Sequence, residues 1–182
     1  TAAAACLPET LFVSASKSGT TTEVTTLTAY FYQQVKAERG RAAGENFVAI
    51  TDAGSALQRY AEAHDFRRCF LNPADVGGRF SVLTAFGMVP AALLGLDLDR
   101  MFNSARTARV GSEVDTPDAD PSALRLGQVM ARSALAGRNK LTLLLSPQLG
   151  AFSVWVEQLV AESIGKSGIG IIPVIDESLP IG

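Results

Sequence analysis

Short apolar runs alternate along the chain with longer segments in which apolar residues recur every three or four positions. The short runs are rich in Val, Ile, Leu and Phe, and they predict β-strands at residues 11–16, 46–51, 67–72 and 139–146, with a candidate final strand at 168–174. The periodic segments predict helices at residues 21–40, 54–64, 78–96, 98–109 and 151–166. This alternation indicates a parallel α/β sheet.

The predicted sheet indicates where a ligand would bind. The continuous apolar run "LTLLL" at residues 141–145 is typical of a strand in a sheet that is covered on both faces. In such sheets, ligands bind beyond the carboxyl ends of the strands. We therefore expect a binding site among the loops that begin after Ser14, Thr51, Leu71 and Ser146.

Two of the predicted helices have informative ends or lengths. Asp120 and Pro121 follow an acidic loop and predict the start of a helix, because Asp caps helices and Pro favours their first turn. The uncharged run at residues 80–96 contains Gly87 and Pro90, and it falls short of the ~20 residues that a membrane-spanning helix needs. We interpret this run as a buried core helix.

Composition and charge exclude several functional classes. Hydrophobic residues make up 47% of the 182 residues and charged residues 19%, which is typical of a globular protein, and the net charge of −2 provides no basic field for nucleic acid. The two cysteines fit neither a disulfide framework nor a CxxC zinc motif, so we expect a reducing, cytoplasmic setting. The chain begins with Thr and shows no signal peptide, and we interpret it as a piece of a longer protein.

The segment "SKSGTTTE" at residues 16–23 joins the first predicted strand to a helix. Thr20 and Glu23 fit a capping box, in which a hydroxyl caps the helix and the Glu side chain reaches back. The helix N-terminus offers unpaired N–H groups, Gly19 lets the backbone approach closely, and Lys17 adds positive charge. This combination suits a phosphate monoester. A plain strand-to-helix turn with a good cap fits the pattern equally well.

The segment "DVGGRFS" at residues 75–81 contains a second candidate group. Its two glycines let the backbone turn tightly just before a helix. Arg79 is the only charge between Asp75 and Asp97, and an arginine at the mouth of an apolar helix can steady an anion in a cleft. The alternative is a surface arginine beside a helix start.

The segment "WVEQLVAESIGK" at residues 155–166 contains a third candidate, Glu162. The predicted buried stripe of this helix consists of Val156, Leu159, Val160 and Ser163. Glu162 lies about 60° around the helix from Leu159 and borders the stripe. In the last helical turn it would oppose the helix dipole and be partly desolvated, and both effects favour a general base. The alternative is a solvated glutamate, which is our interpretation of Glu157.

His64 is the only histidine of the chain. It follows a charged helix, and we interpret it as a surface residue at the helix end. No Ser–His–Asp triad and no histidine metal site can be built around it from the sequence.

Three motifs, "SKSGTTTE", "VGGRFSVLTAFG" and "WVEQLVAESIGKSGIGIIPV", occur in an order and at spacings that resemble the phosphoglucose isomerase family. The resemblance extends from Leu11 to Val174, and its first motif is shared with the wider group of sugar isomerase (SIS) domains. It implies an α/β fold, a three-layer αβα sandwich with a mostly parallel sheet in the flavodoxin-like doubly wound arrangement of SIS domains. It also implies that residues 1–182 form a single SIS-type subdomain that is incomplete at both ends.

The resemblance implies a role for each matching residue. Hydroxyl and backbone N–H groups would hold the phosphate of a sugar at four matching positions, Ser16, Lys17, Ser18 and Thr21. Arg79 matches the arginine that stabilises the enediol(ate) intermediate, and Glu162 matches the base that moves a proton between C2 and C1. Val24 stands where the family often has a hydroxyl residue, so one phosphate contact is lost or supplied elsewhere.

The implied reaction interconverts glucose 6-phosphate and fructose 6-phosphate and requires no metal or organic cofactor. The sugar phosphate is the expected partner, with no nucleic acid and no membrane, and the full-length protein is expected to form a homodimer. The histidine and lysine of ring opening would lie outside this chain, which by itself should be inactive, and a fusion with transaldolase is compatible with the sequence. Two alternatives are a sugar-phosphate-binding SIS domain without turnover and an isomerase of another phosphosugar.

Overall fold

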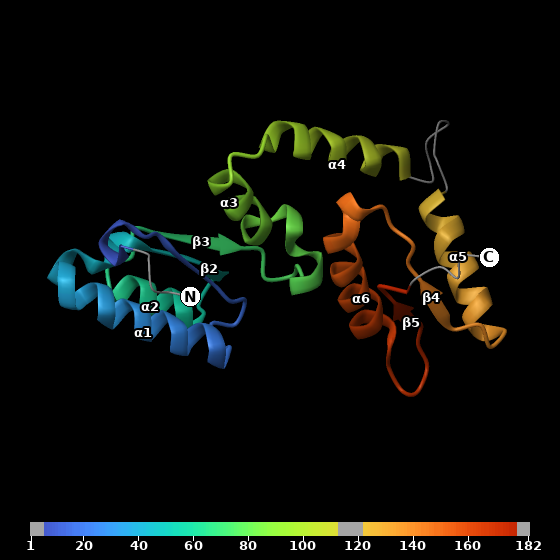
Figure 1. Ribbon diagram of the computed structural model, residues 1–182, viewed down its shortest axis with the longest axis horizontal. Helices are drawn as coiled ribbons and strands as arrows, with labels where there is room; N and C mark the ends of the chain where they lie inside the picture. Colours follow the sequence, from blue (N-terminus) through green and yellow to red (C-terminus); the bar gives the residue numbers. More distant parts are fainter. Residues whose placement is uncertain (1–5, 113–121, 178–182) are drawn as a thin grey trace. The chain divides into compact units, whose positions relative to one another are not determined.

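The computed structural model describes residues 6–112 and 122–177. The chain divides into two compact units, a first unit at Thr1–Asp99 and a second unit at Arg100–Gly182. Figure 1 shows their helices and strands, coloured along the chain. Within the described residues each unit contains a small parallel sheet, so the predicted class of α/β with parallel strands applies to both.

The first unit is built around a three-stranded parallel sheet in the order β1-β2-β3. The strands are β1 (Phe12–Ala15), β2 (Phe47–Asp52) and β3 (Arg68–Asn72). The connecting helices are α1 (Thr22–Arg39), between β1 and β2, and α2 (Ala56–Ala63), between β2 and β3. The remaining elements are the 3-10 turns η1 (Leu7–Glu9), η2 (Gly40–Asn46) and η3 (Gly78–Leu83) and the helix α3 (Ala85–Leu93).

Side-chain alternation along β2 explains how the first unit packs. Phe47 is fully buried and stacks on Phe12 of β1 with ring centroids 4.8 Å apart, in a cluster with Tyr32 of α1. Two residues further on, Ala49 packs against Leu57 of α2. Because alternate residues of a strand share a face, α1 and α2 cover the same face of the sheet, as two right-handed crossovers require.

The opposite face of β2 is buried as well. Val48 and Ile50 point away from α1 and α2, and their exposed fractions are 5% and 0%. The helix α3 contacts β2 and β3. The central strand is thus covered on both faces, which explains its continuous apolar sequence.

The predicted long helix at residues 78–96 is interrupted in the structure. The segment forms η3 and α3, separated at Thr84, whose hydroxyl accepts a hydrogen bond from the backbone N–H of Phe86 at 3.3 Å. Gly87 allows the two pieces to fold together, because a Cβ atom there would lie 2.0 Å from the carbonyl oxygen of Val82. The prediction of one continuous helix is therefore wrong.

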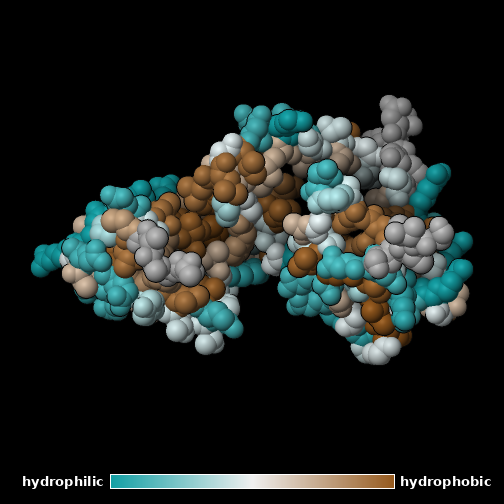
Figure 2. Space-filling model, viewed as in Figure 1, coloured by the Kyte–Doolittle hydropathy of each residue, from teal (hydrophilic) through white to brown (hydrophobic). Residues whose placement is uncertain are grey.

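The prediction that this segment is a buried core helix is also wrong. Within α3 only Met88 and Ala91 are buried, while Leu93 and Leu94 are mostly exposed. Figure 2 shows apolar side chains gathered on the surface over α3. Apolar composition alone predicted burial here, whereas the turn at Thr84 determines which side chains reach the sheet.

The second unit contains a two-stranded parallel sheet and three long helices among its described residues. Its strands are β4 (Lys140–Thr142) and β5 (Ile172–Val174), with Lys140 opposite Ile172. Its other elements are α4 (Leu98–Ser112, which begins in the last residues of the first unit), α5 (Ser122–Leu135), η4 (Pro147–Leu149) and α6 (Gly150–Ile164). The predicted helix start at Asp120 and Pro121 lies outside the described residues, and α5 is described from Ser122 onward.

The strand β4 is shorter than the predicted strand at residues 139–146. Its partner β5 has three residues, and the last ladder hydrogen bond runs from the backbone N–H of Leu143 to the carbonyl oxygen of Val174 at 2.9 Å. Beyond that point the apolar run has no partner strand among the described residues, and Leu144 is 55% exposed. In the described part of the chain, no helix is both long enough and apolar enough to cross a membrane.

The buried phenol of Tyr32 should make the stability of the chain depend on pH in the alkaline range. Burial, together with the nearby charge of Asp65, raises the pKa of Tyr32 above its ordinary value of 10.0. Because the folded state holds this proton more tightly, its contribution is complete below pH 10 and is lost as pH rises through the folded-state pKa. One such group changes the free energy of unfolding by at most about 1.4 kcal/mol per pH unit.

We therefore expect Tyr32→Phe to flatten the decline in the free energy of unfolding above about pH 10, as measured by urea denaturation. Tyr30→Phe is the matched control, because Tyr30 lies on the same helix and is 57% exposed. Equal slopes in both variants would show that burial of Tyr32 does not control the alkaline transition.

Candidate functional site

The polar residues at the carboxyl edge of the first sheet form two rows, because side chains alternate between the two faces. The hydroxyl row lies on the α1 and α2 side and consists of Ser16, Thr21, Thr51 and Ser55. The Lys–Asp–Asn row lies on the opposite side and consists of Lys17, Asp52 and Asn72. Both rows lie at the last residues of the parallel strands and in the loops that follow, which is the edge where the sequence predicted a site.

The hydroxyl row is anchored by Thr51, which is fully buried. Its Oγ1 donates to the backbone carbonyl of Ser16 at 2.6 Å and lies 2.7 Å from Ser55 Oγ. Ser55 Oγ in turn accepts the N–H of Gln58 at 3.0 Å and caps α2. Thr51 thereby joins the end of β1 to the start of α2.

The loop between β1 and α1 is closed by its own hydroxyl groups. Ser16 Oγ lies 3.0 Å from Thr21 Oγ1 and accepts the N–H of Gly19 at 3.1 Å. Ser18 Oγ lies 2.8 Å from Thr20 Oγ1 and accepts the Thr20 N–H at 3.2 Å. Ser16 is buried, whereas Ser18 and Thr21 are exposed, so the loop presents hydroxyl groups to solvent on a supported frame.

The predicted capping box at the start of α1 is wrong. The N-cap residue is Thr21 rather than Thr20, and its side chain makes no cap hydrogen bond, because its hydroxyl pairs with Ser16. The first-turn N–H groups of α1 are therefore not capped by the Thr21 side chain. Uncapped N–H groups and the helix dipole favour an anion at this position.

Gly19 allows a close approach, but to α2 rather than to a ligand. A Cβ atom at Gly19 would lie 2.3 Å from the backbone nitrogen of Leu57, and its φ of +70° also favours glycine. The loop that contains the hydroxyl groups thus rests on the first turn of α2.

The ammonium group of Lys17 is held within the Lys–Asp–Asn row. Its Nζ forms an ion pair with Asp52 Oδ2 and donates to the carbonyl oxygen of Ala74 at 2.9 Å. Asn72 Nδ2 donates to the carbonyl oxygen of Thr51 at 3.3 Å. Two buried acceptors, Asp52 Oδ1 and Asn72 Oδ1, have no hydrogen-bond partner within the described residues. The sequence pointed to the loop after Thr51 but did not identify Asp52 as the partner of Lys17.

Arg79 is half-buried in η3, in the same unit as the two rows. The preceding residue pair does not use the left-handed backbone region, since Gly77 has φ −63° and Gly78 is not among the glycines with positive φ. The turn is instead closed by the Phe80 N–H, which donates to the Gly77 carbonyl at 2.9 Å, and by Ser81 Oγ, which donates to the Gly78 carbonyl at 2.6 Å. These bonds fix the backbone on both sides of Arg79.

Glu162 lies in the second unit, in the last turn of α6, as predicted. Its Oε2 accepts a hydrogen bond from Gln158 Nε2 at 3.4 Å. The expected partial burial is wrong, because Glu162 is exposed and Glu157 is half-buried. The inner face of α6 contains the buried residues Ser153 and Val160, and Glu157 shares that face at spacings of four and three.

One further sequence interpretation concerns His64. His64 ends α2 as expected, but it is half-buried and stacks on Tyr60 with ring centroids 4.0 Å apart, which indicates a packing role.

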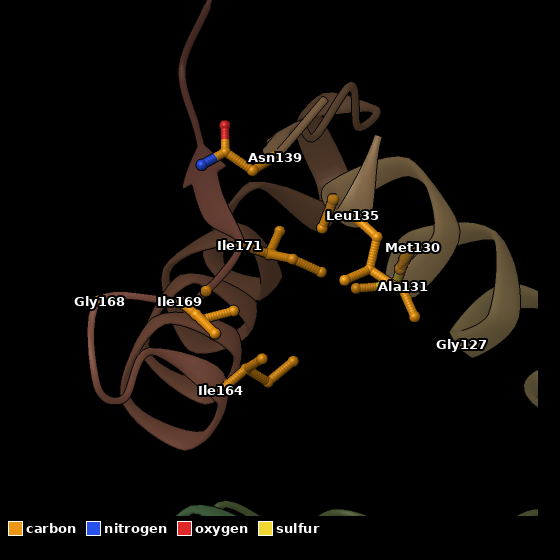
Figure 3. Close-up of a pocket in the computed structure, with 11 residues that line it drawn as sticks. Gly127, Met130, Ala131, Leu135, Asn139, Ile164, Gly168, Ile169 and Ile171 are labelled. Carbon is orange, nitrogen blue, oxygen red and sulfur yellow. The ribbon is translucent and has the colours of Figure 1, made fainter. Parts of the chain in front are cut away.

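An apolar cavity of about 470 Å³ lies in the second unit between α5 and the segment after α6. Figure 3 shows its lining, which includes Met130, Leu135 and Ile171 and none of the predicted site residues. An apolar lining offers no phosphate site, so we assign the candidate site to the sheet edge.

Comparison with known proteins connects this arrangement to one family. Residues 5–171 match the family model described as phosphoglucose isomerase. The chain is 38% identical over 162 residues to the glucose-6-phosphate isomerase of Clostridioides difficile (strain 630), a match that covers 87% of this chain and 35% of that protein. It is 38% identical over 163 residues to the same-named protein of Listeria monocytogenes serotype 4b (strain F2365), with the same coverage. The chain therefore spans about a third of the length of these curated relatives.

Solved structures show the same fold. A hypothetical protein from Thermus thermophilus aligns with a TM-score of 0.78 and 30% identity, over 93% of this chain and 42% of that one. A glucose-6-phosphate isomerase from Chlamydia trachomatis aligns with a TM-score of 0.74 and 24% identity, over 95% of this chain and 36% of that one. These alignments confirm the predicted α/β fold of the SIS type.

The contact between Gly19 and α2 yields a stability prediction. We expect Gly19→Ala to destabilise the chain by the cost of a left-handed non-glycine residue, about 1–2 kcal/mol, plus at least about 1 kcal/mol for the clash with Leu57. Gly54→Ala is the matched control, because Gly54 has φ +74° but no atom within 4 Å of an added Cβ. Thermal unfolding of both variants measures the difference, and equal losses would contradict the close packing of this loop.

Proposed function

The chain belongs to the phosphoglucose isomerase family, and we propose that it supplies the phosphate-binding loop, the anion-stabilising arginine and the base of a glucose-6-phosphate isomerase. The observation that carries this proposal is the loop at residues 16–21, with exposed hydroxyl groups and an uncapped helix N-terminus, in a chain that matches the family model over residues 5–171. The reaction interconverts glucose 6-phosphate and fructose 6-phosphate. Because the chain spans about a third of its relatives' length, this activity is proposed for the full-length protein.

Phosphate binding is proposed for Ser16, Lys17, Ser18 and Thr21. The Ser18 and Thr21 hydroxyl groups are exposed at the start of α1, where N–H groups and the helix dipole favour an anion. Ser16 is buried and orients Thr21 through their 3.0 Å contact. Because the phosphate is remote from the reacting carbons, its binding energy would be used to position the substrate.

Arg79 and Glu162 are proposed to perform the chemistry. Removal of a proton next to a carbonyl places negative charge on oxygen, and a guanidinium group stabilises that charge where it develops. Glu162 would accept the proton at C2 and return it at C1, through an enediol(ate). Its place in the third family motif, in the last turn of α6, supports this role.

A sugar-phosphate-binding domain without turnover is the second candidate. It is favoured by one observation, since the hydrogen bonds that support the phosphate-binding loop lie within the first unit and do not involve Glu162. Two secondary proposals accompany the isomerase: a cytoplasmic setting, which suits two free cysteines, and a homodimer of the full-length protein.

The role of Glu162 can be tested in the full-length protein. We expect Glu162→Gln to reduce kcat by about 10²–10⁴-fold with little change in KM, because an amide cannot accept the proton. Glu157→Gln is the matched control on the same helix and should retain turnover. A Glu162→Gln variant with normal kcat, or a larger loss in Glu157→Gln, would contradict the assignment. Loss of turnover with unchanged sugar-phosphate affinity would show that Glu162 acts in catalysis and does not contribute to substrate binding.

The phosphate-binding loop predicts a second effect. We expect Thr21→Val to raise KM for glucose 6-phosphate and Ki for inorganic phosphate by about tenfold or more, because a hydrogen bond to a charged group is lost. Thr26→Val, an isosteric change at an exposed position of the same helix, should leave both constants unchanged. Equal values for the two variants would show that Thr21 does not contact the phosphate.

A further inference from the structure

The Lys–Asp–Asn row runs across the ends of all three strands of the first sheet. Asp52 of β2 is paired in register with Asn72 of β3, so their side chains share a face. The β1–β2 ladder, in which Ala15 is opposite Ile50, continues to Lys17 and Asp52 through the hydrogen bond from the Asp52 N–H to the Lys17 carbonyl at 3.2 Å. The row is therefore built by strand register.

The Lys17 ammonium group connects three segments that lie far apart in the sequence. It originates in the loop after β1, pairs with Asp52 at the end of β2, and donates to the Ala74 carbonyl in the loop after β3. The first loop contains the phosphate-binding hydroxyl groups, and the third leads through residues 75–78 to Arg79. The side chains of Lys17 and Asp52 are 34% and 17% exposed, so the pair is partly shielded from solvent.

We propose that the Lys17–Asp52 pair is a positioning device that fixes the loop at residues 16–21 relative to the loop at residues 73–77. This inference rests on the proposed function and deepens it. In this arrangement the Lys17 side chain acts through Asp52 and Ala74, and the contribution of Lys17 to phosphate binding comes from its place in the loop. A sugar phosphate held at one loop would then be presented to Arg79 at a set distance.

The burial of the row makes the pair sensitive to single substitutions. Asp52 Oδ1 is buried without a partner in the described residues, and Oδ2 accepts from Lys17. Removing the ammonium group would leave a largely buried carboxylate without this donor, which is strongly unfavourable. Removing the carboxylate would release the Lys17 side chain from β2. Each change should therefore loosen both loops.

A different result is expected if the Lys17 ammonium group contacts the phosphate directly. If Lys17 bound the phosphate through Nζ, loss of Asp52 would free that group for the anion, and phosphate affinity would stay the same or increase. If the pair is a positioning device, loss of Asp52 should weaken phosphate binding even though the positive charge is retained. The variant Asp52→Ala therefore separates the two roles.

The experiment uses the full-length protein and four variants, Lys17→Met, Lys17→Arg, Asp52→Ala and the double variant Lys17→Met/Asp52→Ala. We expect Asp52→Ala and Lys17→Met each to raise Ki for inorganic phosphate and to lower kcat/KM by about 10- to 100-fold. The double variant, which leaves no unpaired charge, should be no worse than either single variant, because both break the same link. Lys17→Arg, which keeps the ion pair, should recover most of the loss. Glu38→Ala controls for loss of an exposed carboxylate in the same unit.

Amide hydrogen exchange provides a readout that does not depend on turnover. We expect faster exchange at both residues 16–21 and residues 73–77 in Asp52→Ala and in the double variant, and wild-type exchange in Glu38→Ala. Unchanged exchange at residues 73–77, or unchanged or tighter phosphate inhibition in Asp52→Ala, would overturn the positioning role. A wild-type protein without isomerase activity would instead refute the proposed function, and the exchange result would still decide whether the pair joins the two loops.

Discussion

The hydrogen bond from the buried hydroxyl of Thr51 to the backbone of Ser16 is the contact on which the candidate site depends. It joins the end of β1 to the end of β2 through a side chain, beside the backbone hydrogen bonds that run from the Ser16 N–H to the Ile50 carbonyl and from the Asp52 N–H to the Lys17 carbonyl. Because Thr51 also contacts Ser55, the same group sets the start of α2, against which Gly19 rests. A buried hydroxyl with its partners satisfied stabilises the fold modestly, but one that lost them would be costly, so this junction is specified strongly.

Next to this junction, successive side chains of the strands point to opposite faces of the sheet and so form the two rows of polar side chains. The hydroxyl row faces the helices and supports the loop that presents Ser18 and Thr21, whereas the Lys–Asp–Asn row connects the strand ends on the other side. The electropositive start of α1 and the Lys17 ammonium group therefore lie at the same edge of the sheet. The charge of Lys17 is balanced by Asp52, so the two groups do not compete for the same anion. The anion would be held mainly by dipoles and hydroxyl groups, which are rigid, rather than by a long and flexible ammonium side chain.

In the second unit, the predicted position of Glu162 is confirmed and its predicted partial burial is not. Glu162 occupies the last turn of α6. It is exposed there, because the inner face of the helix contains Glu157 instead. The proposed role of Glu162 as the base therefore rests on its place in the family motif and not on burial.

Local periodicity and motifs of neighbouring residues were enough to predict the alternation of strands and helices, the position of α1, α2 and α6, and the family. These patterns did not predict the break at Thr84 or the uncapped start of α1, which depend on local side-chain hydrogen bonds that periodicity does not reveal. They also did not predict the short β4, which depends on a partner strand from a distant segment. The difference between local and long-range contacts also decides which residues of the site could be predicted. Ser16, Lys17 and Thr21 could be found from one motif, whereas the pairing of Lys17 with Asp52 appears only when parallel strands bring their carboxyl ends to one edge, since register is a property of the assembled sheet.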